Sequence, residues 1–352
     1  MKETAYSAPQ SLANAGPGFD IFSLAYEPHL RGDVVIAKLT DKFKGAKLTE
    51  IRNNSGLSLG PGNVAEAVGN KVLEFAGEQN KGIELILEKN MRIGTGMGSS
   101  ASSSVAAALA VNDLLEHPFE RNSKEMLEAV VHGEYVATKG SPHGDNVFAS
   151  LLGGFIFITD FANLKYTRWD GGNRVYLVAA SPKNLRVDTA KAREALKSTG
   201  FDIKGIVDLS CRYLQDRMVD SRVSPASYVN GMSGVLKCPE DILAEYLTGG
   251  ALVLGGIRHD LPNDFGHGVN MDRIVTPVRA KFITGYDEVK KAAMNAGAYG
   301  FSISGSGPAV FSVTNQRNAI TVGEGMREAF DRHGVNAEIY YSQINNSGAQ
   351  RI

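Results

Sequence analysis

The sequence has few cysteines, no excess of charge of either sign and no long hydrophobic run. Its two cysteines, Cys211 and Cys238, are too far apart to form a zinc motif or a disulfide framework, so we expect free thiols. A net charge of −1 gives no general attraction to nucleic acid or to an anionic membrane. No stretch approaches the roughly 20 apolar residues that span a bilayer, and the N-terminus lacks an apolar signal core. These absences favour a cytoplasmic protein with a small-molecule partner.

The length of 352 residues, 43% of them hydrophobic, is sufficient for two domains. In the first half, periodicity predicts strands over 33–40, 82–90 and 151–159 and helices over 64–77, 100–115 and 123–139. In the second half it predicts helices over 188–198, 203–218 and 317–332 and strands over 175–180, 301–304, 309–313 and 337–341. The segment 219–271 is rich in glycine and proline and gives the weakest pattern.

The run GTGMGSSASSS, residues 94–104, is the strongest local signal. Gly94, Gly96 and Gly98 alternate between a predicted strand and a predicted helix. Backbone without Cβ atoms can wrap closely around an anion, and the helix that follows adds unsatisfied N–H groups and a positive dipole end. This geometry suits a polyphosphate. A flexible linker is the alternative, but linkers do not run directly into a helical pattern.

Three familiar nucleotide motifs do not match. A Walker loop needs a lysine after its last glycine, where this chain has Ser99 and Ser100. The glycine spacing is GxGxG, whereas the dinucleotide fingerprint is GxGxxG. The DFG tripeptide at 264–266 has no accompanying HRD loop or upstream lysine motif, which excludes a protein kinase.

The loop has little positive charge of its own, because only Lys89 and Arg92 lie close to it in the sequence. A metal ion held by a serine hydroxyl and a carboxylate would therefore carry part of the phosphate charge. Glu134 is the candidate carboxylate, since its spacing from Leu127 and Val130 places it on the inward face of a predicted helix. The alternative is a structural ion pair with Lys139 or an arginine.

Three further segments combine polar side chains with tight turns. His143, Asp145 and Asn146 precede an apolar strand, as a site-lining loop or a plain turn would. Asn14 and Asp20 stand in a glycine-rich stretch near the N-terminus. The segment 301–313 predicts a hairpin whose glycines allow its backbone to approach the phosphate loop.

Together these segments resemble the GHMP small-molecule kinases, and within that superfamily most of all the homoserine kinase branch. The resemblance rests on ANAGPGFD, GTGMGSSASSS, HGDNVFASLLGGF and SGSGPAVF, and also on LGPGNVAEAV, DTAKAREAL and RIVTPVRAKFITGY, all in the same order along the chain. There are departures from the superfamily pattern. Arg92 and Met97 stand where proline and leucine are usual, and the connection from Glu134 to His143 is one residue longer than expected.

The resemblance implies an α+β fold with two domains. A βαβ-type nucleotide-binding domain would span residues 1–165, and a ferredoxin-like α+β domain would span 166–352, with an insertion near 219–271. The implied reaction transfers the γ-phosphate of ATP to the hydroxyl of L-homoserine, giving O-phospho-L-homoserine in threonine biosynthesis. A homodimer is implied as well. Alternatives are a kinase for a mevalonate- or shikimate-type substrate and an inactive ATP-binding regulatory relative.

The resemblance also implies roles for individual residues. ATP would be bound by Gly94, Gly96, Gly98, Ser99, Ser100 and Ala101, with Asn63 near the adenine. Mg²⁺ would be held by Ser99, Ser100 and Glu134. Homoserine would place its ammonium on Asp20 and its carboxylate on Arg193 and Arg279, with Asn14, His143 and Asn146 at its hydroxyl. Whether Asp145 acts as a base, or no carboxylate base is used, stays open at this point.

Overall fold

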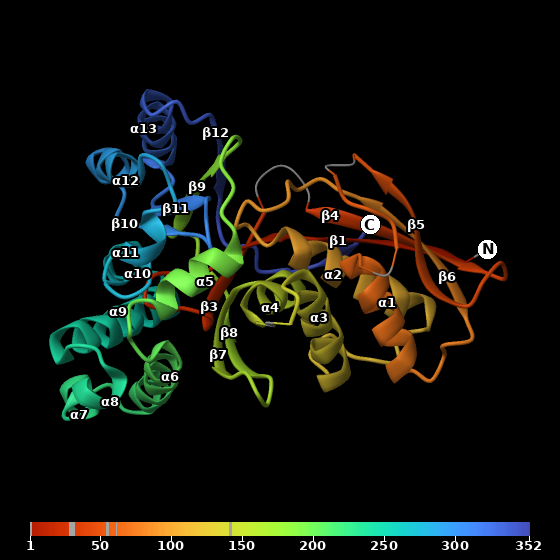
Figure 1. Cartoon of the computed structure of the whole chain (residues 1–352), viewed down its shortest axis with the longest axis horizontal. Coiled ribbons are helices and arrows are strands. Elements are labelled where there is room, and N and C mark those ends of the chain that lie inside the picture. Colours follow the sequence, from red (N-terminus) through yellow and green to blue (C-terminus); the bar gives the residue numbers. More distant parts are fainter. Residues whose placement is uncertain (1, 28–31, 54–55, 61, 141–142) are drawn as a thin grey trace.

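The computed structural model describes residues 2–27, 32–53, 56–60, 62–140 and 143–352. These residues form an α+β structure in two parts, as predicted, and Figure 1 shows the parts side by side along the long axis. No helix among the described residues is long and apolar enough to cross a membrane.

The first part is built on a five-stranded sheet in the order β13-β1-β4-β6-β5. Its strands are β1 (Glu3–Ala8), β4 (Asp33–Thr40), β5 (Gly45–Arg52), β6 (Gly82–Glu88) and β13 (Gln350–Arg351). Helices α1 (Val64–Phe75), α2 (Ser99–Leu114) and α3 (Lys124–Ala137) share one apolar core with this sheet. Of the 16 residues of α2, all but Ser100 are buried. Small alanine and serine side chains allow this helix to lie between the sheet and its neighbours.

A second sheet, in the order β2-β3-β7-β8, joins the two parts. Its strands are β2 (Gln10–Ala13), β3 (Phe22–Tyr26), β7 (Phe155–Asp160) and β8 (Lys165–Trp169). The strand predicted over 151–159 was wrong at its start, because residues 151–152 end helix α4 (Asp145–Leu152). Gly153 and Gly154 follow with φ of 72° and 74°, a left-handed backbone that stops the helix before the strand begins.

The third sheet has the order β10-β11-β9-β12. It comprises β9 (Tyr176–Pro182), β10 (Gly300–Ile303), β11 (Val310–Thr314) and β12 (Ala337–Ser342), and α12 (Tyr286–Asn295) and α13 (Ala319–Arg332) pack on it. Along the chain the order is strand, helices, two strands, helix, strand, and all neighbouring strands are antiparallel. This is the ferredoxin-like arrangement that the family resemblance implied.

Between β9 and α12 the chain is helical: α5 (Thr189–Lys197), α6 (Ile203–Val219), α7 (Ala226–Val229), α8 (Ser233–Leu236), α9 (Glu240–Arg258), α10 (Pro262–Val269) and α11 (Thr276–Ala280). The weakly patterned segment 219–271 is thus mostly helix. Gly256 explains part of its composition, since a Cβ there would lie 2.3 Å from the backbone nitrogen of Phe265 on the packed helix α10. That the segment is an insertion stays a prediction.

The predicted boundary at residue 165 falls at the first residue of β8, which pairs with β7. This hairpin keeps both strands in the sheet that joins the two parts, and it ends at Trp169. The C-terminus then returns to the first part, where Arg351 pairs with Tyr6 of β1. The division of the chain into two domains at residue 165 stays a prediction.

Candidate active site

A cavity of about 250 Å³ lies where the glycine loop meets α3, α4, α5 and α11. The predicted site residues that line it are Asn14, Asp20, Gly94, Gly96, Gly98, Ser99, Ser100, Glu134, His143, Asp145, Asn146, Arg193 and Arg279. Segments that are far apart in the sequence thus meet in one place. Two predicted residues are not among its lining. Ala101 is fully buried in α2, and Asn63 accepts a hydrogen bond from the backbone N–H of Ala65 as the N-cap of α1.

The loop after β6 has the backbone that a phosphate cradle requires. Gly94, Gly96 and Gly98 have φ of 72°, 82° and 72°, and Gly98 caps the N-terminus of α2. The hairpin between β10 and β11 lies against the loop, as the sequence predicted. The Ser304 hydroxyl donates to the Gly96 carbonyl oxygen at 2.6 Å, and a Cβ on Gly96 would lie 2.5 Å from the carbonyl oxygen of Ser304.

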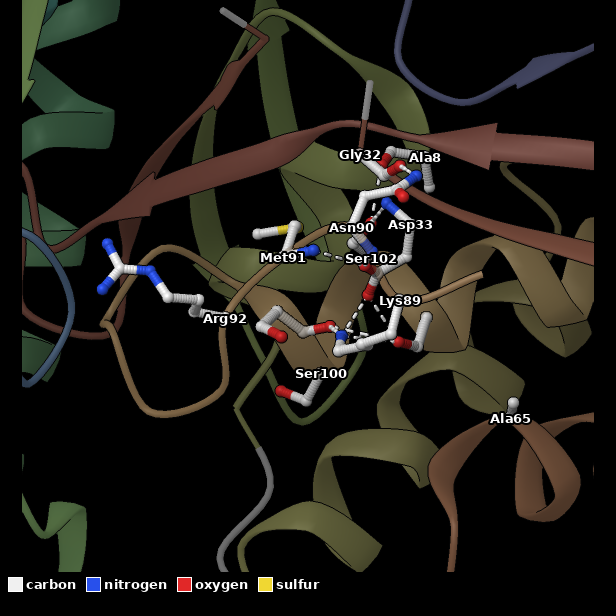
Figure 2. Close-up of polar contacts among 12 residues, drawn as sticks. Ala8, Gly32, Asp33, Ala65, Lys89, Asn90, Met91, Arg92, Ser100 and Ser102 are labelled. Carbon is white, nitrogen blue, oxygen red and sulfur yellow. Dashed lines mark hydrogen bonds and ion pairs between the residues drawn. The ribbon is translucent and has the colours of Figure 1, made fainter. Parts of the chain in front are cut away.

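Arg92, the departure from the usual proline, points away from the cavity. Its guanidinium donates to Glu338 on β12 at 2.8 Å and to the Ser181 carbonyl oxygen at 3.2 Å. Figure 2 shows this side chain extending away from Lys89 and Asp33. Arg92 thus connects the start of the loop to the third sheet and does not line the cavity.

Ser99, Ser100 and Glu134 meet at the start of α2. The Ser100 hydroxyl donates to Glu134 Oε1 at 2.7 Å, and His143 Nε2 lies 3.8 Å from Glu134 Oε2. Glu134 is only 3% exposed, as its position on the apolar face of α3 predicted. The alternative of an ion pair with Lys139 or an arginine is not found among the described residues. The Ser99 hydroxyl is buried without a hydrogen-bond partner.

Asp145 and Asn146 begin helix α4, so the predicted site-lining loop is in fact a helix N-terminus that lines the cavity. Asp145 is 1% exposed, and burial raises the pKa of its carboxyl to about 6 although His143 opposes the shift. Burial lowers the pKa of His143, but the carboxylates of Asp145, Glu134 and Asp20 outweigh it and raise that pKa. The Asn146 side-chain oxygen accepts from the Ser11 hydroxyl at 2.8 Å.

The cavity lining also includes Asp20 and two arginines, Arg193 and Arg279. Arg193 Nη2 lies 3.1 and 3.2 Å from the two carboxylate oxygens of Asp20. The sequence assigned these two residues to opposite ends of a ligand, whereas here they pair with each other. Arg279 is 2% exposed, and its Nε has no hydrogen-bond partner. Burial lowers the pKa of Arg279 to about 10, and the guanidinium carbons of Arg279 and Arg193 lie 4.8 and 5.5 Å from the Phe19 ring centroid.

Asn14 fixes the backbone at Asp20 and Gly305. It has a φ of 59°, donates to the Gly305 carbonyl oxygen at 3.1 Å and accepts from the Asp20 backbone N–H at 2.8 Å. Sequence reasoning missed Thr189 and Ser306, which also line the cavity with hydroxyl oxygens 3.0 Å apart. The blocks DTAKAREAL and SGSGPAVF contain them, but neither residue carries a charge that would have drawn attention to it.

Comparison with known proteins gives the same assignment along the whole chain. Residues 61–154 match the GHMP kinases N terminal domain, and residues 257–332 match the GHMP kinases C terminal domain. The chain is 32% identical to the homoserine kinase of Pyrococcus abyssi over an alignment of 343 residues, and this alignment covers 97% of each protein. It is also 32% identical to the homoserine kinase of Chlorobaculum tepidum, over 100% of this chain and 99% of that protein. The crystal structure of homoserine kinase from Cytophaga hutchinsonii superimposes with a TM-score of 0.82 at 29% identity, over 100% and 98% of the two chains.

Proposed function

Because the chain belongs to the GHMP kinase family and is an ATP-dependent small-molecule kinase, we propose that it phosphorylates the side-chain hydroxyl of L-homoserine. The product is O-phospho-L-homoserine. Full-length similarity to proteins named homoserine kinase supports this acceptor. The observation that carries the proposal is that one carboxylate, Asp20, and two guanidinium groups, Arg193 and Arg279, line the same cavity as the glycine loop. Homoserine is a zwitterion, so its two charges need such partners.

The carboxylate of homoserine is recognised by Arg279 and Arg193. A buried guanidinium needs hydrogen-bond acceptors, and Arg279 has one, the Gly305 carbonyl oxygen at 2.5 Å, while its Nε is left without a partner. An incoming carboxylate supplies the missing acceptor. Arg193 contacts Asp20 through Nη2, and its remaining guanidinium N–H groups are available in this proposal to the carboxylate of homoserine. The ammonium of homoserine then pairs with the Asp20 carboxylate and replaces part of its contact with Arg193.

ATP binds with its phosphates on the glycine loop and on the N-terminus of α2. Residues 94–96 and 98–100 line the cavity, and α2 begins at Ser99, so the positive end of its dipole lies at this loop. Lys89 and Arg92 do not line the cavity, so the loop itself supplies no cationic side chain. The ATP phosphates therefore need a further positive charge.

Mg²⁺ fits the group of Ser99, Ser100 and Glu134. Carboxylate and hydroxyl oxygens are ligands that this ion accepts. The buried Ser99 hydroxyl has no hydrogen-bond partner. Among the described residues, the cationic group paired with Glu134 is His143, at 3.8 Å. When bound, Mg²⁺ neutralises charge on the β- and γ-phosphates. No cluster of three His, Cys, Asp or Glu side chains suited to a metal occurs among the described residues, so Ser99, Ser100 and Glu134 would hold Mg²⁺ together with ATP.

At the hydroxyl of homoserine, His143, Asn14 and Asn146 orient the nucleophile, and Asp145 supplies a negative charge. Both possible functions of Asp145, accepting the hydroxyl proton or holding His143 protonated beside it, require the ionised carboxylate. A pKa of about 6 keeps that form dominant at neutral pH. The buried carboxylate of Asp145, one residue before Asn146 in the cavity lining, supports this proposal.

The pH dependence of turnover tests this function of Asp145. We expect kcat/KM to fall as the pH drops below about 6, because protonation removes the charge. Asp145→Asn should remove this limb and lower the rate at pH 7. Thermal unfolding gives the control: the folded-state pKa of Asp145 lies above its ordinary value, so ionisation destabilises the fold as the pH rises toward 6, and the asparagine variant should melt at a higher temperature at pH 7. An unchanged pH profile in that variant would exclude the proposed function.

The acceptor itself is tested by measuring ADP release with homoserine, threonine, mevalonate and shikimate in parallel. Turnover of homoserine with the highest kcat/KM is expected. Preference for mevalonate or shikimate would assign the chain to another substrate within the family, and binding of Mg-ATP without phosphorylation of any acceptor would indicate an inactive regulatory relative. The predicted homodimer and cytoplasmic location stay predictions.

A further inference from the structure

Lys89 and Asp33 form a buried ion pair beside the start of α2 (Figure 2). Neither residue lines the cavity. The two side chains are 2% and 0% exposed. Lys89 is the residue after β6, and Asp33 is the first residue of β4. Burying two charges costs several kcal/mol per ion in desolvation, so such a pair is often no more stable than an apolar replacement. Its presence in this position therefore calls for another explanation than stability.

Every polar group of the pair is satisfied. The Lys89 ammonium donates to Asp33 Oδ2, to the Ser99 carbonyl oxygen at 3.0 Å and to the Ser103 hydroxyl at 3.0 Å, which uses all three of its N–H bonds. Ser103 in turn donates to Asp33 Oδ2 at 2.6 Å. Asp33 Oδ1 accepts from the backbone N–H groups of Asn90 and Met91, each at 3.0 Å.

Through these hydrogen bonds, the side chains of Lys89 and Asp33 anchor the backbone at both ends of the glycine loop. Met91, held by Asp33, lies three residues after the end of β6, and Ser99, held by Lys89, is the first residue of α2. Between them lie three glycines with positive φ, which have no side chains to anchor the backbone. The hydrogen bond from Ser304 to Gly96 holds the middle of the loop. Fixing the two ends therefore determines where the N–H groups of the loop point.

We propose that Lys89 and Asp33 are positioning residues for ATP, which fix the glycine loop and the first turn of α2 in the geometry that binds the phosphates. The inference rests on the proposed binding of ATP at this loop and is independent of the acceptor. Neither side chain touches the cavity, so their effect passes through the loop backbone and through Ser99 and Ser100. Preorganised N–H groups bind an anion without the cost of ordering the loop at that moment.

The test compares two neighbouring serines of α2. Ser103→Ala removes a hydroxyl that bonds both members of the pair, whereas Ser104→Ala removes one that is equally buried but has no hydrogen-bond partner. Calorimetry with Mg-ADP, in the absence of any acceptor, should show affinity reduced about threefold or more by Ser103→Ala and unchanged by Ser104→Ala. Equal affinities in the two variants would overturn the proposal.

A larger effect is expected from the double variant Asp33→Asn/Lys89→Met. It removes both charges together and leaves an amide oxygen for the N–H groups of Asn90 and Met91, so no uncompensated buried charge opposes folding. We expect the Kd for Mg-ADP and the KM for ATP to rise about tenfold or more, and the KM for homoserine to change less than about twofold. A lower melting temperature with unchanged Mg-ADP affinity would show a structural function only. Arg52→Met/Glu88→Gln, at an exposed pair beside the end of the same strand, is the control and should leave both constants unchanged.

Failure of this inference is distinguishable from failure of the proposed acceptor. If homoserine is not phosphorylated but Mg-ADP binds and the Ser103 and double variants weaken it, the positioning function stands and the acceptor is wrong. If homoserine is phosphorylated and neither variant alters nucleotide affinity, the acceptor stands and the positioning function is wrong.

Discussion

Replacing Glu134 by glutamine is expected to lower kcat by on the order of a hundredfold or more, with a smaller effect on the KM for homoserine. Glu134 is buried beside Ser100, and it is the carboxylate nearest to the start of α2 in the cavity lining. The proposed Mg²⁺ would lose its anionic ligand while the shape of the side chain is kept. Charge that develops on the transferred phosphoryl group would then be less well stabilised.

The measurement is kcat as a function of free Mg²⁺ at saturating ATP and homoserine. The glutamine variant should need a higher Mg²⁺ concentration for half-maximal rate. Glu128→Gln is the matched control, because Glu128 lies on the same helix in an exposed pair with Lys124 and should behave as the unaltered protein does. If Glu134 only orients Ser100 as a hydrogen-bond acceptor, glutamine retains that oxygen, and a near-normal rate with an unchanged Mg²⁺ requirement would contradict the metal-binding function.

The elements that the sequence predicted well are those with strong local patterns. Helix α2 and strand β4 were expected almost to the residue, because the apolar periodicity and the glycines at their ends act locally. Helix α4 was missed because its apolar residues continue without a polar break into β7, so only the positive φ of Gly153 and Gly154 separates them. Helices α9 and α10 contact each other closely at their glycines. These glycines interrupt the apolar periodicity from which a helix is predicted.

The residues that line the candidate site could be predicted, but their partners could not. Motifs of glycine, serine and polar residues are local, and the structure brings them to one cavity. Pairings such as Arg193 with Asp20, which are 173 residues apart, and Lys89 with Asp33, which are 56 apart, depend on the tertiary fold. Asn63 illustrates the converse, since its position in a family motif predicted a nucleotide contact whereas a helix N-cap is the local use of its side chain.

Arg279→Met is expected to raise the KM for homoserine by about 30-fold or more, equivalent to roughly 2 kcal/mol, and to leave the KM for ATP within about twofold. Methionine fills much of the volume of the buried arginine stem against Phe19, so the main loss is the guanidinium. Without it, the carboxylate of homoserine enters a buried position with one cationic partner fewer. Steady-state kinetics with each substrate varied in turn measures the two constants.

The comparison with Arg193 makes this test specific for carboxylate recognition. Arg193→Met also removes a guanidinium, but it leaves Asp20 without the partner that it has in the structure, so the ammonium of homoserine gains full access to that carboxylate. The lost guanidinium weakens binding of the homoserine carboxylate, whereas the freed Asp20 strengthens binding of its ammonium. Because these two effects oppose each other, Arg193→Met should raise the KM for homoserine less than Arg279→Met does. Arg273→Ala is the control. Arg273 lies six positions before Arg279 in the sequence, is exposed and pairs with Glu245, so its replacement should leave both KM values unchanged. An unaltered KM for homoserine in Arg279→Met would place the carboxylate elsewhere, and a larger effect of Arg193 than of Arg279 would mean that the Asp20–Arg193 pair stays intact when homoserine binds.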